Sequence, residues 1–368
     1  MKIAIVGTRG IPANYGGFET FAEELSTRLV ERGHQVTVYG RSNNVRHTSR
    51  VYRGVRLVIL PTIPTKHLDT VAHTFLSVFH ALFADYDIIL MCNAANAVFS
   101  IVPRLGGIPV ALNVDGIERK RGKWGVAGRT FYRISEHLAS LLPTVAVTDA
   151  GVIADYFLDR HDTPSVMIAY GADCRRQEST EFIEALGLKS RNFLLYVSRL
   201  ELENNAHLVI EAYGRVETSM PLVIVGDAPY AAGYIRQLKS MADSRVEFTG
   251  AIYGDGCLEL RSHAYLYFQA TEVGGTHPAL LEAMGAGNCV LAKDNPEHRE
   301  VLDSTGLYFN DATDLTELLR EVLADPDCVA RYRRRTRSRV HMQYSWGKVT
   351  RQYEDLFEEM MATGIRNA

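Results

Sequence analysis

The residues best suited to chemistry gather in one stretch, Gly274-Gly275-Thr276-His277-Pro278, which is followed by Glu282. An apolar run over 264–268 predicts a short strand before this stretch, and apolar residues at helical spacing over 279–284 predict a helix after it. Thr276 is a candidate N-cap, and Pro278 suits the first turn of the helix. Such a junction offers unpaired backbone N–H groups and the positive end of a helix dipole, which together favour a bound phosphate.

Glu282 lies about one turn inside the predicted helix, where its carboxylate could accept hydrogen bonds from a sugar hydroxyl. A second interpretation stays open, because an ordinary turn between a strand and a helix would leave Glu282 on a solvated face. A glycine-rich turn without a fixed fingerprint does not decide between the two interpretations.

A second strand–loop–helix pattern opens the chain. Lys2–Val6 is an apolar run typical of a strand buried on both faces of a parallel sheet, and the glycine-containing loop Gly7–Gly17 follows it. The next segment is an amphipathic helix that ends at Gly33; its apolar side contains Phe18, Phe21, Ala22, Leu25 and Leu29. Because the loop is longer than the G-x-G-x-x-G fingerprint, NAD and FAD are disfavoured as ligands.

Strand and helix patterns then alternate along the chain in two series. The strands of the first series are expected over 35–39, 55–60, 88–92, 110–114 and 144–147, and those of the second over 193–198, 222–225, 246–249, 264–268 and 289–292. Helices are expected over 69–83 and after Trp346. Two such series predict an α/β fold with two Rossmann-like, doubly wound parallel-sheet domains.

Sheet patterning lapses between 168–173 and Asn192, which places the domain boundary there. We expect domains over 1–172 and 173–346, and a C-terminal helix over 347–368 that packs back towards the first domain. Paired domains of this kind bind ligands at the carboxyl ends of their strands, so the site should be the central cleft between them.

The composition of the 368-residue chain excludes several classes of protein. Hydrophobic residues make up 46% and charged residues 23%, as in soluble globular proteins, and a net charge of -3 argues against nucleic acid as a partner. The five cysteines are scattered without a CxxC pair, which argues against a disulfide framework or a zinc site. No apolar run reaches the roughly 18 residues that span a bilayer. We therefore expect a cytoplasmic protein without a metal or a cofactor.

Six ordered motifs resemble those of one enzyme family. They are Gly7-Thr-Arg-Gly-Ile-Pro-x-x-Tyr-Gly-Gly-Phe-Glu19, Asn113-Val-Asp-Gly-Ile-Glu118, Tyr170-Gly-Ala-Asp173, Ser198-Arg-Leu-Glu-Leu-Glu-Asn-Asn205, Ile224-Val-Gly-Asp227 and Val273-Gly-Gly-Thr-His-Pro-Ala-Leu-Leu-Glu-Ala-Met284. Through these motifs, which span nearly the whole chain, the sequence is similar to the retaining GT4 glycosyltransferases of the GT-B fold. Within them it most resembles a bacterial rhamnosyltransferase branch with an N-terminal DUF1972 region.

The resemblance implies roles at the donor site. Glu282 corresponds to the glutamate that binds the ribose of a sugar nucleotide, and Arg199 to the arginine that neutralises the diphosphate. In the Gly16-Gly17 loop, the backbone of Gly17 corresponds to the glycine that packs against the diphosphate. Gly275, Thr276 and His277 form the phosphate-facing helix start. A departing nucleoside diphosphate gains negative charge, which the guanidinium fork of Arg199 and the backbone N–H donors can stabilise in catalysis.

Two positions depart from the common pattern of the family. Gly274 stands where many members have a second glutamate, and Asn204 replaces the lysine that usually accompanies the arginine. The rhamnosyltransferase branch shares both features, and Asn204 stays among the expected donor-site residues. Without the lysine, His277 or Arg9 could supply the missing stabilisation of the diphosphate.

Two carboxylates are candidates in the first domain. Asp115 follows a strand at a place where the family has a polar residue near the reacting sugar, so it is expected to be catalytic, either by holding a sugar hydroxyl or by assisting the acceptor. It could instead be a loop residue that caps the next turn. Glu19 is a candidate acceptor contact, although a carboxylate in the first turn of a helix also suits the helix dipole.

The cluster Arg119-Lys120-Arg121-Gly122-Lys123-Trp124 combines basic residues with a tryptophan. This composition suits anionic headgroups or a lipid diphosphate, and a solvated charge run is the alternative. We therefore expect peripheral contact with the inner membrane face.

The resemblance predicts a metal-independent enzyme that transfers a hexose with retention. L-rhamnose from dTDP-L-rhamnose is the expected donor, with UDP as another possible nucleotide, and a lipid-linked saccharide is the expected acceptor in cell-surface polysaccharide biosynthesis. A GT-B sugar-nucleotide epimerase and a non-catalytic nucleotide-sugar-binding protein are the alternatives.

Overall fold

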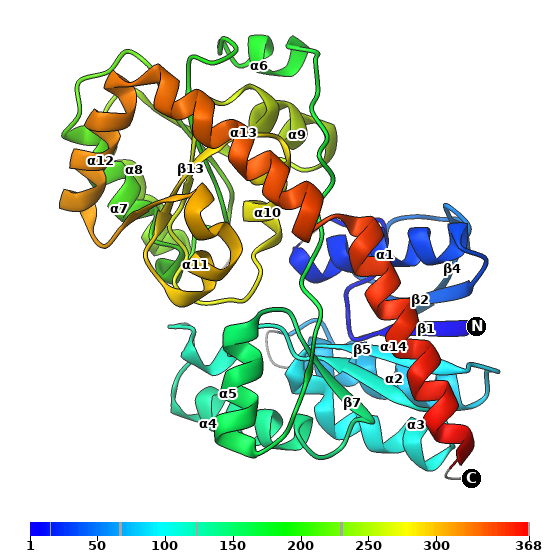
Figure 1. Cartoon of the computed structure of the whole chain (residues 1–368). Coiled ribbons are helices and arrows are strands. Elements are labelled where there is room, and N and C mark those ends of the chain that lie inside the picture. Colours follow the sequence, from blue (N-terminus) through cyan, green and yellow to red (C-terminus); the bar gives the residue numbers. More distant parts are fainter. Residues whose placement is uncertain (15, 66–67, 123, 229–230, 367–368) are drawn as a thin grey trace. The chain divides into compact units, whose positions relative to one another are not determined.

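The chain folds into two compact units in a computed structural model that describes residues 1–14, 16–65, 68–122, 124–228 and 231–366 (Figure 1). Unit 1 contains Met1–Tyr170 and the C-terminal residues from Trp346 onwards, and unit 2 contains Gly171–Ser345. The boundaries predicted after residues 172 and 346 lie next to these two crossings of the chain.

Unit 1 is built on a sheet that has eight strands among the described residues, in the order β3-β4-β2-β1-β5-β6-β7-β8. The strands are β1 (Lys2–Val6), β2 (Gln35–Arg41), β3 (Val51–Tyr52), β4 (Val55–Leu60), β5 (Ile88–Cys92), β6 (Val110–Asn113), β7 (Val145–Thr148) and β8 (Val166–Met167). All neighbours pair in parallel except β3 and β4, which pair antiparallel at one edge.

Helices alternate with these strands. They are α1 (Gly17–Glu31), α2 (Asp69–Leu82), α3 (Ile101–Leu105), α4 (Val126–Ala139), α5 (Gly151–His161) and α14 (Trp346–Arg366), with 3-10 turns η1 (Ala94–Ser100) and η2 (Glu118–Lys120). The central strands β1 and β5 are almost completely buried, as their continuous apolar runs predict. Each fully buried Ile, Leu or Val there contributes roughly 1.5–3 kcal/mol to folding.

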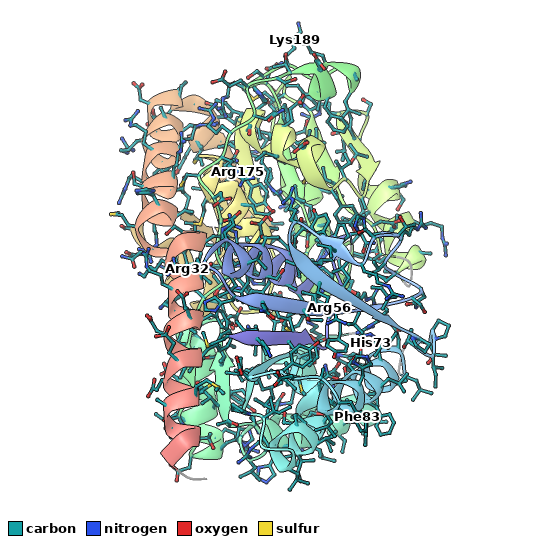
Figure 2. The ribbon with its side chains drawn as sticks, turned by 90° about the vertical axis from the view of Figure 1, so that its right-hand side faces the viewer. Arg32, Arg56, His73, Phe83, Arg175 and Lys189 are labelled. Carbon is teal, nitrogen blue, oxygen red and sulfur yellow. The ribbon has the colours of Figure 1, made fainter. Side chains whose placement is uncertain are left out.

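The C-terminal helix α14 packs against α1 within unit 1. Arg32 and His34, which follow α1, reach the two carboxylate oxygens of Glu354 on α14, each at 2.7 Å. Figure 2 shows Arg32 beside α14. The hydrogen bond from Arg32 is the main reason that the pKa of Glu354 is lowered. These contacts join the end of the chain to its first βαβ segment.

Unit 2 contains a parallel sheet with six strands among the described residues, in the order β11-β10-β9-β12-β13-β14. The strands are β9 (Leu194–Val197), β10 (Leu222–Val225), β11 (Val246–Gly250), β12 (Leu266–Gln269), β13 (Cys289–Lys293) and β14 (Leu307–Phe309). The helices are α6 (Glu181–Ala185), α7 (Ala206–Gly214), α8 (Ala232–Met241), α9 (Gly254–His263), α10 (Pro278–Gly285), α11 (Pro296–Leu302), α12 (Ala312–Ala324) and α13 (Pro326–Gln343), with 3-10 turns η3 (Leu202–Asn204) and η4 (Asp303–Thr305).

The predicted fold of two Rossmann-like parallel-sheet domains is confirmed. Each strand that the apolar runs predict is present, with ends that differ by at most two residues. The edge strands β3, β8 and β14 were not predicted. They are two or three residues long, too short to carry a recognisable alternation of apolar and polar residues.

Candidate functional site

In unit 2 the glycine-rich loop joins the end of β12 to the start of α10. Pro278 is the first residue of α10, as predicted, but the N-cap is His277 rather than Thr276. The reason is that the residue before a proline is pushed out of the helical region, and His277 has φ -47° and ψ 112°. Its carbonyl accepts the N–H of Leu280 at 3.0 Å, while Thr276 is buried.

The ring of His277 lies over the backbone of Gly274. A Cβ atom at position 274 would overlap this imidazole, so a side chain there requires His277 to move. The ring centroid of His277 also lies 5.2 Å from that of His298, with an interplanar angle of 54°. The ring of His277 thus packs against both Gly274 and His298.

His298 lies in α11 and is fully buried. Its Nδ1 is 2.8 Å from the carbonyl oxygen of Lys293, so Nδ1 donates a proton to this oxygen. Burial lowers the pKa of His298 to about 4, which keeps the ring neutral at pH 7. The N–H of His298 donates to the N-cap Asn295 at 2.8 Å. The sequence analysis missed His298; the Asn-Pro-x-His spacing of a capped helix start is the signal that locates it.

Glu282 on α10 forms an ion pair with Arg261 on α9, with 2.7 Å between Oε2 and Nη1. The side chain of Glu282 is 33% exposed, whereas Arg261 is buried. Contacts with Cys257, Glu282 and Tyr267 raise the pKa of Arg261 although burial opposes the shift. Glu282 thus presents an oriented carboxylate at the surface of the unit, and Arg261 is a site residue that sequence reasoning missed.

Arg199 follows the end of β9. Its side chain is 37% exposed, and its guanidinium lies 3.5 Å from the carboxylate of Glu201. Asn204 is buried, and its Nδ2 donates to the carbonyl oxygen of Arg199 at 2.6 Å. Asn204 therefore shapes the loop that carries Arg199, and its amide adds no charge in place of the family lysine.

The predicted donor-site residues of unit 2 follow the carboxyl ends of two strands of its sheet. β9 and β12 are neighbours and run in parallel, so the loops that follow them emerge together. Two hydrogen bonds tie these loops: the N–H of Glu272 donates to the carbonyl of Glu203 at 2.9 Å, and Nδ2 of Asn205 donates to the carbonyl of Ala270 at 3.0 Å. The geometry provides a guanidinium, a helix start and a carboxylate, which suits a nucleoside diphosphate.

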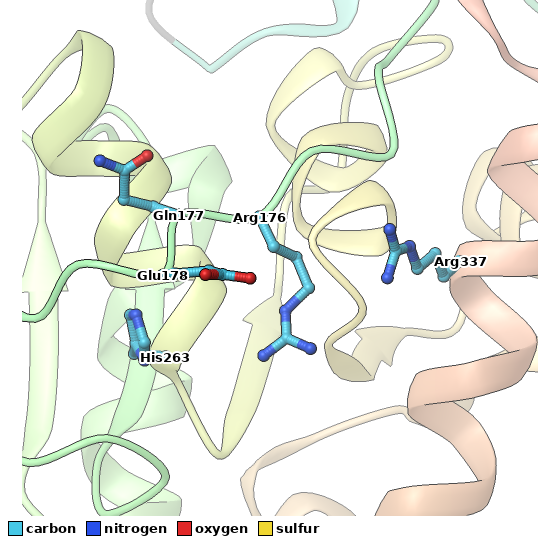
Figure 3. A pocket seen from close by; sticks show the side chains of 5 residues that line it. All are labelled: Arg176, Gln177, Glu178, His263 and Arg337. Atoms are coloured by element: carbon cyan, nitrogen blue, oxygen red, sulfur yellow. The ribbon is translucent and has the colours of Figure 1, made fainter.

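A separate pocket of about 430 Å³ lies elsewhere in unit 2 (Figure 3). Its lining residues are Arg176, Gln177, Glu178, His263 and Arg337. His263 ends α9 and stands just before β12, so the pocket lies where β12 begins. It is therefore not part of the candidate donor site, which lies where β12 ends.

In unit 1 the loop over Gly7–Gly17 is held by carboxylates of α1. Glu19 accepts the N–H of Arg9 at 2.9 Å, and Glu23 accepts the N–H of Ala13 at 2.6 Å. Gly16 is the N-cap of α1 in an extended conformation, and Gly17 is its first residue. Glu19 is 5% exposed, and burial raises its pKa against the opposing effect of Arg9. This placement favours a structural role for Glu19 over contact with an acceptor.

Asp115 stands two residues beyond β6, in the left-handed region with φ 58°. Its N–H donates to Oδ1 of Asn113 at 3.0 Å, and its own Oδ1 accepts the hydroxyl of Tyr170 at 3.1 Å. Burial raises the pKa of Asp115, and the charge of Arg121 opposes this shift. The carboxylate is thus held in a fixed orientation at the carboxyl end of the sheet.

In the cluster 119–124, the described side chains of Arg119, Arg121 and Trp124 bind carboxylates within unit 1. Arg119 binds the buried Glu136 at 2.9 Å, and Arg121 binds Glu118 at 2.6 Å. Trp124 donates its indole N–H to Glu118 at 3.3 Å and packs on Tyr132. Arg119, Arg121 and Trp124 thus each have an acceptor within unit 1, and membrane contact of the cluster stays a prediction.

Lys123 lies outside the described residues, as does the side chain of Lys120. Over the described parts of the chain, none of the helices combines the length and apolar character needed to cross a membrane. The same parts contain no group of three or more His, Cys, Asp or Glu side chains arranged to hold a metal ion.

Comparisons with known proteins agree with this architecture. Residues 15–174 match the family "Glycosyltransferase Family 4", and residues 178–339 match "Glycosyl transferases group 1". O-antigen chain mannosyltransferase C of Escherichia coli is 23% identical over 390 residues, and the alignment covers 98% of this chain and 99% of that protein.

Solved structures share the fold across the whole chain. Sucrose-phosphate synthase from Thermosynechococcus elongatus has a TM-score of 0.84 at 16% identity, with 98% of this chain and 99% of that chain covered. Anabaena HepE in complex with UDP and glucose has a TM-score of 0.80 at 16% identity, covering 98% and 100%. WaaG, a glycosyltransferase involved in lipopolysaccharide biosynthesis, has a TM-score of 0.74 at 17% identity, covering 96% and 99%.

The fold is therefore GT-B. The two family matches occupy consecutive parts of the chain; the first lies in unit 1 except for its last four residues, and the second lies in unit 2. Together with the mannosyltransferase relative, they support glycosyltransferase as the class of this protein.

Proposed function

We propose that the protein transfers L-rhamnose from dTDP-L-rhamnose to a lipid-linked saccharide during the assembly of a cell-surface polysaccharide. The observation that carries the donor half of this proposal is the joint placement of Arg199, the Gly275–His277 helix start and Glu282 at the ends of β9 and β12. The rhamnose donor rests on the motif resemblance given above.

The reaction needs no metal in this proposal. The bond between the anomeric carbon and the diphosphate breaks, and its electron pair stays on the diphosphate, where Arg199 and the N–H groups of the α10 start stabilise the growing charge. The acceptor hydroxyl oxygen forms the new bond on the same face, which retains the configuration. Its proton passes to the departing diphosphate. Glu282 holds the ribose of the donor, and Asp115 accepts a hydrogen bond from a hydroxyl of the acceptor saccharide.

Mannosyl transfer is a second candidate, because the relative in Escherichia coli is an O-antigen chain mannosyltransferase. UDP-glucose is a third donor to test, because HepE has been solved with it. The O-antigen relative and WaaG both support a role in polysaccharide or lipopolysaccharide assembly. We propose that the protein works at the cytoplasmic side of the inner membrane, where a lipid-linked acceptor is presented.

A thermal-shift screen over dTDP-rhamnose, GDP-mannose and UDP-glucose tests the donor. A ligand at a hundred times its Kd stabilises the folded state by about 2.7 kcal/mol, so the true donor stands out. Incubation of the selected donor with lipid-linked saccharides then tests transfer. Epimerised sugar nucleotide formed without an acceptor would indicate the epimerase alternative. Donor binding with no product from any acceptor would indicate a non-catalytic binding protein.

A further inference from the structure

Asp115 is connected to the C-terminal helix through a short chain of buried groups in unit 1. Asn113, the last residue of β6, accepts the N–H of Asp115 on Oδ1 at 3.0 Å. Its Nδ2 donates to the hydroxyl of Tyr353 on α14 at 2.9 Å. Asn113 and Tyr353 are both completely buried. The two ends of one amide therefore join the backbone of Asp115 to a helix that lies more than two hundred residues further along the chain.

Tyr170 holds the other side of Asp115. Its hydroxyl donates to Oδ1 of the carboxylate at 3.1 Å, and its ring is 3% exposed. It is also the last residue of unit 1 before the chain crosses to Gly171. Tyr170 thus stands where the chain leaves unit 1, and its side chain orients the candidate catalytic carboxylate of Asp115.

Phe21 of α1 packs against both tyrosines. Its ring centroid lies 5.2 Å from that of Tyr170 and 5.4 Å from that of Tyr353. It also lies 6.5 Å from Trp346, where the chain re-enters unit 1 at the start of α14. α1 itself begins at the Gly16-Gly17 loop, so one aromatic cluster connects this loop, both crossing points and the two tyrosines that reach Asp115.

We propose that Tyr170 and Tyr353 are positioning residues for Asp115. Through Tyr353, helix α14 then belongs to the part of the site in unit 1 that receives the acceptor. This inference rests on the role given to Asp115 in the proposed function. The two tyrosines have different tasks. Tyr170 sets the rotamer and the charge state of the carboxylate. Tyr353 acts through Asn113 on the backbone, and keeps Asp115 in its left-handed conformation, which costs free energy for any residue other than glycine.

The charged surroundings of Asp115 give these tasks different pH signatures. Arg121 and the hydrogen bond from Tyr170 favour its ionised form, while burial and the charge of Glu118 oppose it. Cys92 at the end of β5 and Asp149 after β7 are the other titratable groups of this neighbourhood. The hydroxyl of Tyr170 donates to the carboxylate, so its removal must raise the pKa of Asp115. Removal of the Tyr353 hydroxyl leaves all these groups in place.

The experiment compares Tyr170→Phe, Tyr353→Phe and a matched control, Tyr39→Phe. Tyr39 is also a fully buried tyrosine of unit 1, and its hydroxyl bonds His80 rather than Asn113 or Asp115. For Tyr170→Phe we expect kcat to fall about tenfold or more and the acid limb of the pH–rate profile to move to higher pH. For Tyr353→Phe we expect a similar fall in kcat with the acid limb unmoved. Donor Kd should stay at the parent value in all three.

A double-mutant cycle isolates the Tyr353 step. If Tyr353 acts through Asn113, then Tyr353→Phe should have no further effect on kcat in an Asn113→Ala background. Independent losses that multiply would overturn the role of Tyr353. Thermal unfolding of each variant checks that the unit is still folded.

A titration that needs no turnover separates this inference from the proposed function. The carbon-13 shift of the Asp115 carboxyl, assigned with Asp115→Asn, reports its pKa in the parent and in Tyr170→Phe. An unchanged pKa in Tyr170→Phe overturns the role of Tyr170, whatever the enzyme transfers. An inactive parent with a raised pKa in the variant would instead refute the proposed reaction and leave the positioning role of Tyr170 intact.

Discussion

The imidazole of His277 occupies the space that any side chain at position 274 would need. This overlap explains physically why position 274 is occupied by glycine in this chain. The GT4 resemblance implies a glutamate at this position, and in this chain the ring of His277 leaves no room for its side chain. The neutral ring of His298 packs against His277 and supports this arrangement.

Restoring the family glutamate should therefore harm the donor site. We expect Gly274→Glu to weaken nucleotide-sugar binding, because the new side chain must displace His277 from the start of α10. Overpacking of this kind typically costs about 1–3 kcal/mol, or up to roughly a hundredfold in Kd if it falls on the bound state. Calorimetry with the donor measures it. The control is Gly233→Ala in α8, where an added Cβ meets nothing within 4 Å. Tighter donor binding by Gly274→Glu would contradict the argument.

Replacing Glu282 with Ala should weaken nucleotide binding about tenfold or more, because a charge-assisted hydrogen bond to the ribose contributes roughly 1.5–3 kcal/mol. Glu282→Gln should retain part of the affinity but lose the ion pair with Arg261. The measurement is calorimetry with the nucleoside diphosphate. Equal affinity of Glu282→Ala and the parent would remove Glu282 from the ribose site.

Loss of the guanidinium in Arg199→Ala should reduce turnover more than it reduces binding of the free nucleoside. The reason is that the partner of Arg199 is the diphosphate charge, which grows in the transition state. Single-turnover rates and nucleoside affinity measured side by side separate the two effects. Arg236→Ala, an exposed arginine of α8, serves as the control. A parent rate in Arg199→Ala would mean that the guanidinium points away from the diphosphate.

The sequence predicts the framework of both units because their central strands are continuous apolar runs, such as Ile88–Cys92. It also predicts Pro278 at the start of α10, because proline has a strong positional preference there. Contacts between distant residues leave no local pattern. The ion pair of Arg261 with Glu282 and the bond of Asn113 to Tyr353 arise only when strands and helices pack.

The basic cluster 119–124 shows that the partners of charged side chains also cannot be predicted from the sequence alone. From composition alone, Arg119 and Arg121 suit a membrane surface, but each finds a carboxylate within unit 1. Arg119→Ser should leave the buried Glu136 without its cation and lower the free energy of unfolding by about 1–3 kcal/mol. Denaturant unfolding measures this loss. Co-sedimentation with anionic vesicles should be the same for the variant and the parent, and a selective loss of vesicle binding would restore the membrane interpretation.

The buried His298 should make unit 2 sensitive to acid. Its pKa of about 4 in the folded state lies below the ordinary value of 6.5. Between pH 4 and pH 6.5, His298 therefore binds a proton in the unfolded chain but not in the folded chain. Stability therefore falls as pH decreases from 6.5 to 4, by up to about 3 kcal/mol, and is regained as pH rises. His298→Gln cannot titrate and should flatten this part of the curve. His73→Gln is the matched control, because His73 also has a pKa of about 4 but lies in unit 1. Hydrogen exchange of the backbone amides of α10 and α11, measured at pH 7 and pH 5, reports the stability of unit 2 separately from that of unit 1. Protection that falls equally in His298→Gln and the parent would show that another group carries the acid sensitivity.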